Sequence, residues 1–305
     1  MNLKDILIVL FVIFIWSINL VIQKIFSQKI SLDFFNLLRF LSCVPLLLVF
    51  KRPSVAFLKI LGVSLFWNVL TFFFVGLSLH SGTNIGTVSF VYQTCAFFGI
   101  FFCFLLLKEI PTISQIIGIV ISFSGVALLF SHAISQVSTE VNQIKGVIFT
   151  LFAAMSWGMG ATLIKKFKMP SDLNTNIWIT GLATLPMLGM IYGQHDDTFW
   201  EKSYSALSSE ILLGALYAGY IANLLGNCLW LSLLKKYPSS LVTPFMLLLP
   251  FFSSLLSYCF LEEKFTTLQL SAFFIIALGL SINQNLFTYL INACKRGYKT
   301  WISIN

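Results

Sequence analysis

An isolated basic residue, Arg39, lies well inside a largely apolar stretch of this sequence, residues 33 to 50. Placing an arginine at the centre of a lipid-spanning helix costs about 2.5–3.5 kcal/mol on insertion scales, so its presence needs a physical cause. The guanidinium could neutralise the carboxylate of a small solute, bond to a helix carbonyl, or extend to the membrane–water interface. The sequence leaves a substrate-binding role and a structural role for Arg39 both open.

Amide and aromatic side chains recur on helix faces that would otherwise be apolar. Trp16, Asn19 and Gln23 are spaced i, i+3 and i+7, which places them on one face of a helix. Further residues of the same kinds are Trp67, Asn68, Thr71, Tyr92, Gln93, Trp157, Asn223 and Asn227. Together they could line a cavity that holds an amphipathic small solute. They could equally form hydrogen bonds between helices, worth about 0.6 kcal/mol each in a membrane.

Residue sets typical of catalysis or metal binding are not evident. The three histidines, His80, His132 and His195, fall near loops and are interpreted as solvated loop residues. The six cysteines lie in or beside apolar runs without a CxxC pair: Cys43, Cys95, Cys103, Cys228, Cys259 and Cys294. We therefore predict no disulfide framework, no metal site and no cofactor, and we expect the protein not to be an enzyme.

The composition places the chain in a membrane. Of its 305 residues, 58% are hydrophobic and only 10% are charged, with a mean hydropathy of +0.90. Ten segments are apolar enough to cross a bilayer as helices. They are residues 5–25, 33–50, 57–79, 84–106, 112–130, 146–165, 174–192, 210–232, 238–261 and 267–289.

The basic residues predict how these helices are oriented. The net charge of +8 comes from residues at the ends of apolar runs, so it indicates topology and not nucleic-acid binding. If the amino terminus is cytoplasmic, thirteen of the 19 Lys and Arg residues face that side. We therefore predict a multi-pass protein of the cytoplasmic (inner) membrane with both termini in the cytoplasm. The long connection 193–209 then faces outward.

The sequence is duplicated. The stretch 77–125 returns 154 residues later, with Glu109, Thr112, Gln115 and Gly125 matched in this register: Glu263, Thr266, Gln269 and Gly279. The first two helices return 141 residues later, where Trp16, Lys24 and Pro45 are matched by Trp157, Lys165 and Pro186. Because each unit contains five helices, an odd number, the second unit is predicted to lie inverted in the membrane. This is a construction that secondary transporters use, with a substrate site between the halves.

The repeated glutamates, Glu109 and Glu263, lie at helix ends beside Lys108 and Lys264. We expect each to order its hairpin bend or to pair with the neighbouring lysine; a role in ion coupling is the alternative. No carboxylate falls in the middle of a predicted span. The sequence thus gives no support for proton coupling, and exchange or facilitated movement stays open.

These features resemble the EamA branch of the drug/metabolite transporter superfamily. The resemblance rests on two five-helix repeats, a Trp in the first helix of each, Arg39 in the second, and the Glu-x-x-Thr-x-x-Gln run followed by Gly. Pro244 and Pro250 fit the family's proline-containing stretch, whereas the fourth helix has Phe90 and Ala96 there. The resemblance implies transport of small metabolites, often amino acids or related compounds and often outward.

We therefore predict an all-α integral membrane protein with ten transmembrane helices in two inverted five-helix repeats. The repeats are expected over residues 1–131 and 145–289, followed by a cytoplasmic tail, 290–305. The predicted function is alternating-access transport, most simply export, of amino acids or related metabolites. The alternative is an integral membrane enzyme or lipid-handling protein. The expected partners are a small-molecule substrate and membrane lipids but no nucleic acid, and a homodimer is left open.

Overall fold

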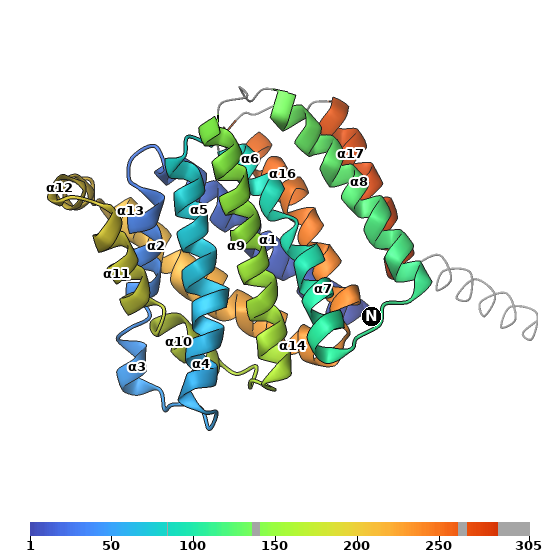
Figure 1. Ribbon diagram of the computed structural model, residues 1–305, viewed down its shortest axis with the longest axis horizontal. Coiled ribbons are helices and arrows are strands. Elements are labelled where there is room, and N and C mark those ends of the chain that lie inside the picture. Colours follow the sequence, from blue (N-terminus) through green and yellow to red (C-terminus); the bar gives the residue numbers. More distant parts are fainter. Residues whose placement is uncertain (84, 136–140, 262–266, 286–305) are drawn as a thin grey trace, which may run out of the picture.

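A computed structural model describes residues 1–83, 85–135, 141–261 and 267–285, and over these residues it is built from helices without strands (Figure 1). The first half contains α1 (Leu3–Phe26), α2 (Leu32–Leu41), α3 (Leu46–Val49), α4 (Phe57–Ser64), the π-helical η1 (Leu65–Leu70), α5 (Thr71–His80), α6 (Ile85–Tyr92), α7 (Cys95–Leu107) and α8 (Ile113–Ser135). The second half contains α9 (Val141–Lys166), α10 (Leu173–Gly181), α11 (Thr184–Gln194), α12 (Asp197–Ser205), α13 (Ser209–Leu216), the π-helical η2 (Tyr217–Leu225), α14 (Gly226–Lys236), α15 (Ser239–Val242), the 3-10 helix η3 (Thr243–Leu248), α16 (Leu249–Leu261) and α17 (Thr267–Asn283).

Within the described residues, seven helical stretches are long and apolar enough to cross a membrane. They are Leu3–Phe26, Leu32–Val49, Phe57–His80, Val88–Leu107, Ile144–Lys166, Ser209–Lys236 and Ser239–Phe260. Two of the remaining predicted spans are shorter apolar helices, Ile113–Leu128 and Leu270–Asn283. The third, predicted over 174–192, is divided between α10 and α11 at residues 182–183.

Short polar side chains begin several of these helices. Asn2, Ser31, Asp172 and Ser208 each accept a hydrogen bond from a backbone N–H of the first turn that follows. Such caps satisfy N–H groups that have no partner within the helix. These four residues therefore help to fix where α1, α2, α10 and α13 begin.

Two of the long helices are interrupted at matching places by π-helical turns. η1 lies between α4 and α5, and η2 lies between α13 and α14. In η1 the wider turn lets the hydroxyl of Thr71 donate to the carbonyl of Phe66 at 2.9 Å. Such π turns widen the helix locally and are frequent at functional sites.

The fourth and ninth predicted spans, residues 84–106 and 238–261, are also broken at matching places. The ninth carries Pro244 and Pro250 around η3, where proline removes backbone donors. The fourth lacks these prolines, yet α6 ends at Tyr92 and α7 begins at Cys95. There the Thr94 hydroxyl donates to the carbonyl of Val91 at 2.7 Å, which stabilises the turn without proline. The difference in proline content therefore does not remove the break.

Helix bounds repeat at the sequence offsets found in the duplication. α7 and α16 begin and end at residues 154 apart, and α8 and α17 begin 154 apart. α2 and α10 begin 141 residues apart. The duplication in sequence is thus also a duplication of helix ends.

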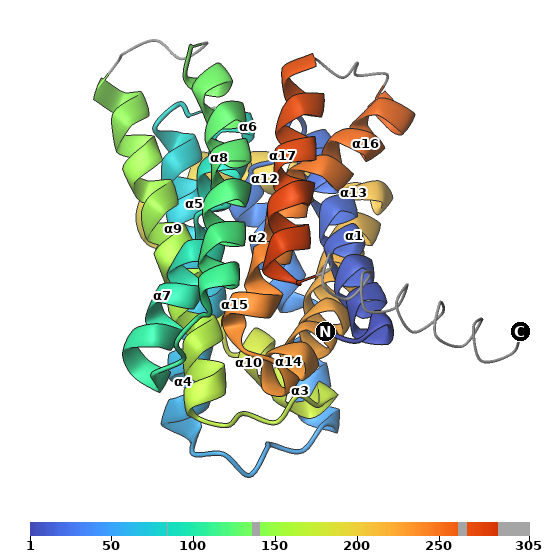
Figure 2. The ribbon, with the colours of Figure 1, turned by 90° about the vertical axis from the view of Figure 1, so that its right-hand side faces the viewer.

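The helices α8 and α17 pack side by side and run antiparallel (Figure 2). Glycines permit their close approach, because a Cβ at Gly118 would lie 2.5 Å from the backbone N of Asn283. Near the other end of the contact, a Cβ at Gly125 would lie 2.8 Å from the carbonyl of Ala272. Small residues commonly serve this purpose in membrane helices.

Four tryptophans connect the two halves through the middle of the bundle. The ring centroids of Trp67 and Trp157 are 4.9 Å apart, those of Trp157 and Trp230 6.1 Å, and those of Trp230 and Trp16 5.2 Å. Trp230 is completely buried. Large apolar side chains also cover the outside of the bundle, including Leu48 and Phe274, as expected of a surface that faces lipid.

Candidate functional site

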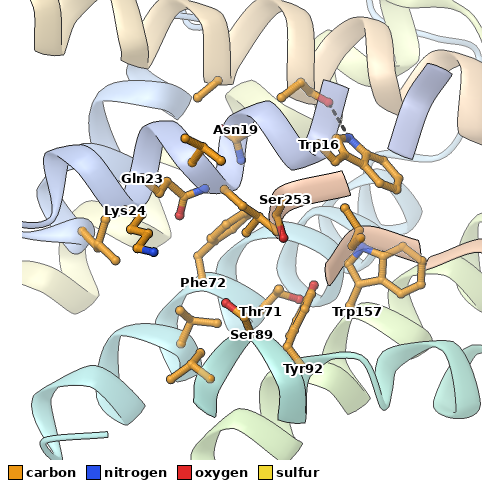
Figure 3. A pocket seen from close by; sticks show the side chains of 18 of the residues that line it. Trp16, Asn19, Gln23, Lys24, Thr71, Phe72, Ser89, Tyr92, Trp157 and Ser253 are labelled. Atoms are coloured by element: carbon orange, nitrogen blue, oxygen red, sulfur yellow. Dashed lines mark hydrogen bonds between the residues drawn. The ribbon is translucent and has the colours of Figure 1, made fainter. Parts of the chain in front are cut away.

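A cavity of about 430 Å³ lies between the two halves and is lined by three of the four tryptophans, Trp16, Trp67 and Trp157. Its walls come from helices of both halves, chiefly α1, α2, η1, α5, α6, α9, η2 and α16. All twelve residues singled out from the sequence line it: Trp16, Asn19, Gln23, Arg39, Trp67, Asn68, Thr71, Tyr92, Gln93, Trp157, Asn223 and Asn227. Figure 3 shows several of their side chains around the same space.

The polar face of α1 forms one wall. The indole N–H of Trp16 donates to the carbonyl of Ala222 at 2.8 Å, which fixes its ring against η2. Gly226 makes room for that ring, because a Cβ there would lie 2.7 Å from the indole nitrogen. Asn19 accepts a hydrogen bond from the Arg39 guanidinium at 3.0 Å. The spacing of Trp16, Asn19 and Gln23 therefore produces one continuous polar and aromatic surface.

Arg39 is held inside the protein on the wall of the cavity. Arg39 is only 2% exposed, so its side chain does not extend to the outer surface of the bundle. Its guanidinium lies 4.6 Å from the centre of the Phe72 ring, a cation–π contact. Within the described residues it has no carboxylate partner, and its Nε has no hydrogen-bond partner. The Arg39 guanidinium is thus a buried cation on the cavity wall, and no acidic side chain among the described residues neutralises it.

Two amide side chains of the first half, Asn68 and Gln93, also carry polar atoms that lack a hydrogen-bond partner among the described residues. Asn68 donates through its amide nitrogen to the carbonyl of Ile179 at 3.3 Å, and Gln93 donates to the carbonyl of Ser89 at 3.3 Å. Their oxygens, Asn68 Oδ1 and Gln93 Oε1, are buried without a partner among the described residues. Because buried polar atoms are nearly always satisfied, these are positions where a bound molecule can donate hydrogen bonds.

The asparagines of the second half mainly bond to each other and to a neighbouring helix. Asn227 donates to Asn223 at 3.1 Å, and Asn223 donates to the hydroxyl of Thr180 at 3.3 Å. Interhelical bonding and cavity lining, the two alternatives given by the sequence, therefore both occur, and in the asparagines they occur in the same residues.

The structure also adds cavity residues that the sequence analysis did not select. Ser253, Ser254 and Ser257 come from α16, and Lys24 comes from the last turn of α1. The serines are spaced i, i+1 and i+4 in an apolar helix, which is a signal that could have identified them. In the sequence, Lys24 is notable only as the residue that Lys165 repeats.

The cavity extends toward the end of the bundle where α1 and α5 end, since Lys24 and Leu79 line it there. The opposite end is joined by ionic contacts between distant helices. Asp5 of α1 accepts from Lys236 at 2.6 Å and from the hydroxyl of Tyr237 at 2.5 Å. These contacts tie the start of α1 to the end of α14.

Glu109 contributes a second contact at this opposite end. Its carboxylate pairs with Lys165 of α9 and accepts a hydrogen bond from the backbone N–H of Ser239, at the start of α15, at 2.9 Å. Of the two expected roles, pairing with the adjacent Lys108 is wrong, because the left-handed backbone at Lys108 ends α7 and Glu109 meets the second half instead. That Glu109 orders its hairpin bend stays a prediction. Glu263 lies outside the described residues, as does the tail 290–305.

The histidines require a further correction. His195 is not a solvated loop residue, because its side chain is 12% exposed and its ring stacks on Phe199 at 3.7 Å. Both His80 and His195 contact the carboxylate of Asp33, which the sequence analysis did not select. The side chain of His132 lies outside the described part of the structure.

Taken together, membrane-length helices from two similar halves that enclose a polar and aromatic cavity define a multi-pass membrane transport protein. The sequence pattern of the EamA-like transporter family matches residues 3–131 and 144–283. The chain belongs to this family and is a transporter of the drug/metabolite transporter superfamily.

Similar proteins agree with this class. The chain is 27% identical to a protein of Salmonella typhimurium (strain LT2) named "Probable amino-acid metabolite efflux pump", over 93% of this chain and 95% of that one. It is 26% identical to a protein of the same name from Escherichia coli (strain K12), with the same coverage. A solved structure titled "Crystal structure of protein" matches with a TM-score of 0.73 at 17% identity, covering 94% of this chain and 99% of that one, and so shares the fold. These findings point to a transporter and away from an enzyme.

Proposed function

We propose that this protein is a secondary transporter that exports amino acids or closely related metabolites by alternating access. The observation that carries the proposal is the buried Arg39 guanidinium on the cavity wall, without an acidic partner among the described residues. A buried charge is expensive unless it is paired, so a substrate carboxylate is the natural counter-ion. Amino acids supply that group.

The rest of the cavity fits the same class of substrate. The unpartnered oxygens of Asn68 and Gln93 can accept hydrogen bonds from an amino group. The indole rings of Trp16, Trp67 and Trp157 offer a surface for an apolar or aromatic side chain. The cavity volume lies within the range of small-molecule sites, about 300–1,000 Å³. We therefore expect apolar and aromatic amino acids to be the preferred substrates.

The arrangement of the halves supports an alternating-access cycle. We propose ten membrane helices in two inverted five-helix repeats, over residues 1–131 and 145–289. The matched helix bounds and the antiparallel packing of α8 against α17 support this. The cavity reaches one end of the bundle while Asp5, Glu109 and their partners join the other end. In our proposal the described state is open outward, in a cytoplasmic membrane with both termini in the cytoplasm.

Export is proposed because both bacterial relatives named above are called efflux pumps. No carboxylate, histidine or cysteine occurs among the described residues that line the cavity. The cavity walls thus offer none of the carboxylates or imidazoles that form proton relays in membrane transporters, and exchange is the coupling mode we propose.

Counterflow in proteoliposomes tests the proposal. Vesicles containing the purified protein and preloaded with unlabelled phenylalanine are mixed with radiolabelled phenylalanine, and uptake is compared with that of vesicles carrying Arg39→Gln. Saturable accumulation that depends on the internal amino acid and is lost in Arg39→Gln supports the carrier. Equal uptake by protein-free vesicles, across a panel of amino acids, would reject amino acids as substrates. Hydrolysis or group transfer on lipid substrates would instead favour the membrane-enzyme alternative.

A further inference from the structure

Three side chains with metal-binding atoms converge at the end of the bundle where α5 ends, outside the cavity walls described above. Asp33 lies in the first turn of α2, His80 is the last residue of α5, and His195 follows α11. Asp33 Oδ2 lies 2.6 Å from His80 Nε2 and 3.3 Å from His195 Nε2. One ligand atom from each of the three residues lies within 4.8 Å of the others. Although the sequence alone predicts no metal site, we propose that Asp33, His80 and His195 bind a divalent transition-metal ion of the zinc type.

The ligand types fit this class of ion. Imidazole nitrogen and carboxylate oxygen are common zinc ligands, with bond lengths of about 2.0–2.2 Å. Ligand atoms around a tetrahedral ion then lie about 3.3 Å from one another. The distance between Asp33 Oδ2 and His195 Nε2 already has this value. The distance between Asp33 Oδ2 and His80 Nε2 needs to lengthen by less than 1 Å, because two metal bonds replace the hydrogen bond that joins these atoms. The proton of that hydrogen bond must leave Nε2 when the ion binds: a neutral imidazole carries it on Nδ1 instead, with no net loss, whereas an imidazolium releases it to solvent.

The backbone of α5 is shaped to receive the carboxylate. A Cβ on Gly76 would lie 2.1 Å from Asp33 Oδ1, so the absence of a side chain at this position is what allows the carboxylate to lie against the helix. The Asp33 side chain is only 6% exposed. In the described state the contacts with the two imidazoles compensate this burial, and a bound metal ion would supply positive charge in their place.

His195 is held in position by aromatic contacts. Its ring stacks on Phe199 with ring planes 11° apart, and the neighbouring Trp200 contacts Phe34 of α2 at a centroid distance of 6.1 Å. These contacts fix the segment that carries His195 next to α2. A fixed ring loses little conformational freedom when it binds an ion.

The site has room for a ligand beyond the three protein atoms. A hollow of about 360 Å³ adjoins Asp33 and His80 and is also lined by Ser27 and Ser31. Water can reach the ion from this side, so a three-residue site with an open position results. Magnesium and calcium prefer oxygen ligands, and the two imidazoles therefore favour zinc-type ions over them.

A bound ion would connect the two halves of the transporter. Asp33 and His80 belong to the first half, whereas His195 lies in the second, and Leu32 and Leu79 beside them line the cavity end. Zinc should therefore slow the opening and closing of this end. This consequence rests on the proposed transport cycle, whereas metal binding itself does not.

Calorimetric titration of the full chain tests the binding. Tag-free protein in detergent, stripped with a chelator, is titrated with Zn²⁺ and separately with Mg²⁺. We expect one Zn²⁺ per chain and no Mg²⁺ binding. His80→Ala and His195→Ala should each weaken zinc binding by at least about tenfold. His132→Ala, which removes the remaining histidine, is the matched control and should bind zinc as the wild type does.

A spectroscopic measurement on the wild type avoids dependence on variants that fold poorly. Co²⁺ at this site should give visible ligand-field absorption that Zn²⁺ abolishes. Zinc binding that is equally tight in the double variant His80→Ala/His195→Ala would overturn the proposal. So would a wild type that shows neither zinc uptake nor a Co²⁺ spectrum, in which case the cluster is a hydrogen-bonded Asp–His contact only. Zinc binding without any effect on counterflow would leave the metal site in place and reject its connection to transport.

Discussion

At the scale of single residues, the charge of Arg39 is the feature on which the proposed substrate class depends. Its contacts with Asn19 and Phe72 orient the guanidinium but leave its positive charge without a counter-ion among the described residues. A guanidinium binds a carboxylate through two parallel hydrogen bonds, whereas an ammonium offers only a point charge. The two groups should therefore differ in function at this position.

The first prediction concerns substitutions of Arg39. Arg39→Gln should lower counterflow by about 10–100-fold, because a hydrogen bond to a charged group contributes about 1.5–3 kcal/mol. Arg39→Lys should retain part of the activity, since it keeps the charge but loses the planar donor pair. Uptake is measured alongside the amount of protein in the vesicles. Unchanged counterflow in Arg39→Gln at normal protein levels would show that Arg39 has a structural role only.

The second prediction concerns Glu109. Its pairing with Lys165 and its bond to the start of α15 join the halves at the end opposite the cavity opening. Glu109→Gln should destabilise the protein by about 1–3 kcal/mol, because it removes a charge from a partly buried pair and leaves Lys165, 12% exposed, with only its hydrogen bond to the carbonyl of Tyr237.

The measurement is a thermal melt of four proteins: wild type, Glu109→Gln, Lys165→Met and the double variant. If the residues interact as described, the double variant loses less stability than the two single variants together. Strict additivity of the two losses would contradict a direct contact. Substituting the adjacent lysine, Lys108→Met, serves as the control for the pairing predicted from sequence.

At the scale of helices, α8 and α17 show how the repeat organises contacts. Gly125 and Gly279 are equivalent residues of the repeat, and so are Gly118 and Ala272. Gly125 of α8 packs against Ala272 of α17, and Gly279 of α17 packs against Gly118 of α8. Ser122 donates to the carbonyl of Ile276, which is its own equivalent residue 154 positions later. A contact between equivalent residues is the mark of a local two-fold axis. The antiparallel direction of the pair agrees with the inverted repeats that we propose.

The third prediction follows from this close packing. Gly279→Ala should destabilise the protein by about 1–3 kcal/mol, since its Cβ would lie 2.5 Å from the backbone N of Ser122, which cannot move aside as a flexible side chain would. Gly62→Ala is the matched control, because no atom lies within 4 Å of its Cβ position. In that helix alanine should be neutral or stabilising by about 0.4–1 kcal/mol. Equal melting temperatures for the two variants would argue against tight packing of α8 on α17.

At the scale of the whole molecule, the inverted arrangement makes a prediction about accessibility. The connections that follow the second predicted span of each half, residues 33–50 and 174–192, should lie on opposite faces of the membrane. Lys51 and Asp197 are exposed residues in or next to these two connections. Lys51→Cys should react with a membrane-impermeant thiol reagent only after the membrane is opened, and Asp197→Cys should react in intact cells.

The background protein for this labelling carries Cys259→Ser and Cys294→Ser. Cys259 is exposed in the structure, and Cys294 lies outside the described residues. Without an introduced cysteine, this background protein must not react with the thiol reagent. Labelling of both introduced cysteines from the same side would contradict inversion, and with it the proposed alternating-access cycle.

The sequence was sufficient for several conclusions. Composition and the lengths of apolar runs identify a membrane protein, and the register that relates Glu109 to Glu263 identifies the duplication. The family followed from the same pattern and is confirmed. The spacing of Trp16, Asn19 and Gln23 placed them on one face, and all twelve selected residues line one cavity. That they bind the substrate stays a prediction.

These successes share a physical cause: helix periodicity and the cost of polar groups in lipid act locally, and both can be read from neighbouring residues. Which distant atoms meet is decided differently, by the rotation and packing of whole helices. Asp33 contacts His80 and His195, which lie 47 and 162 positions away, and Glu109 pairs with Lys165 of another helix and not with its neighbour Lys108. Only the tertiary structure could place those pairs, because no local pattern encodes the direction in which one helix faces another.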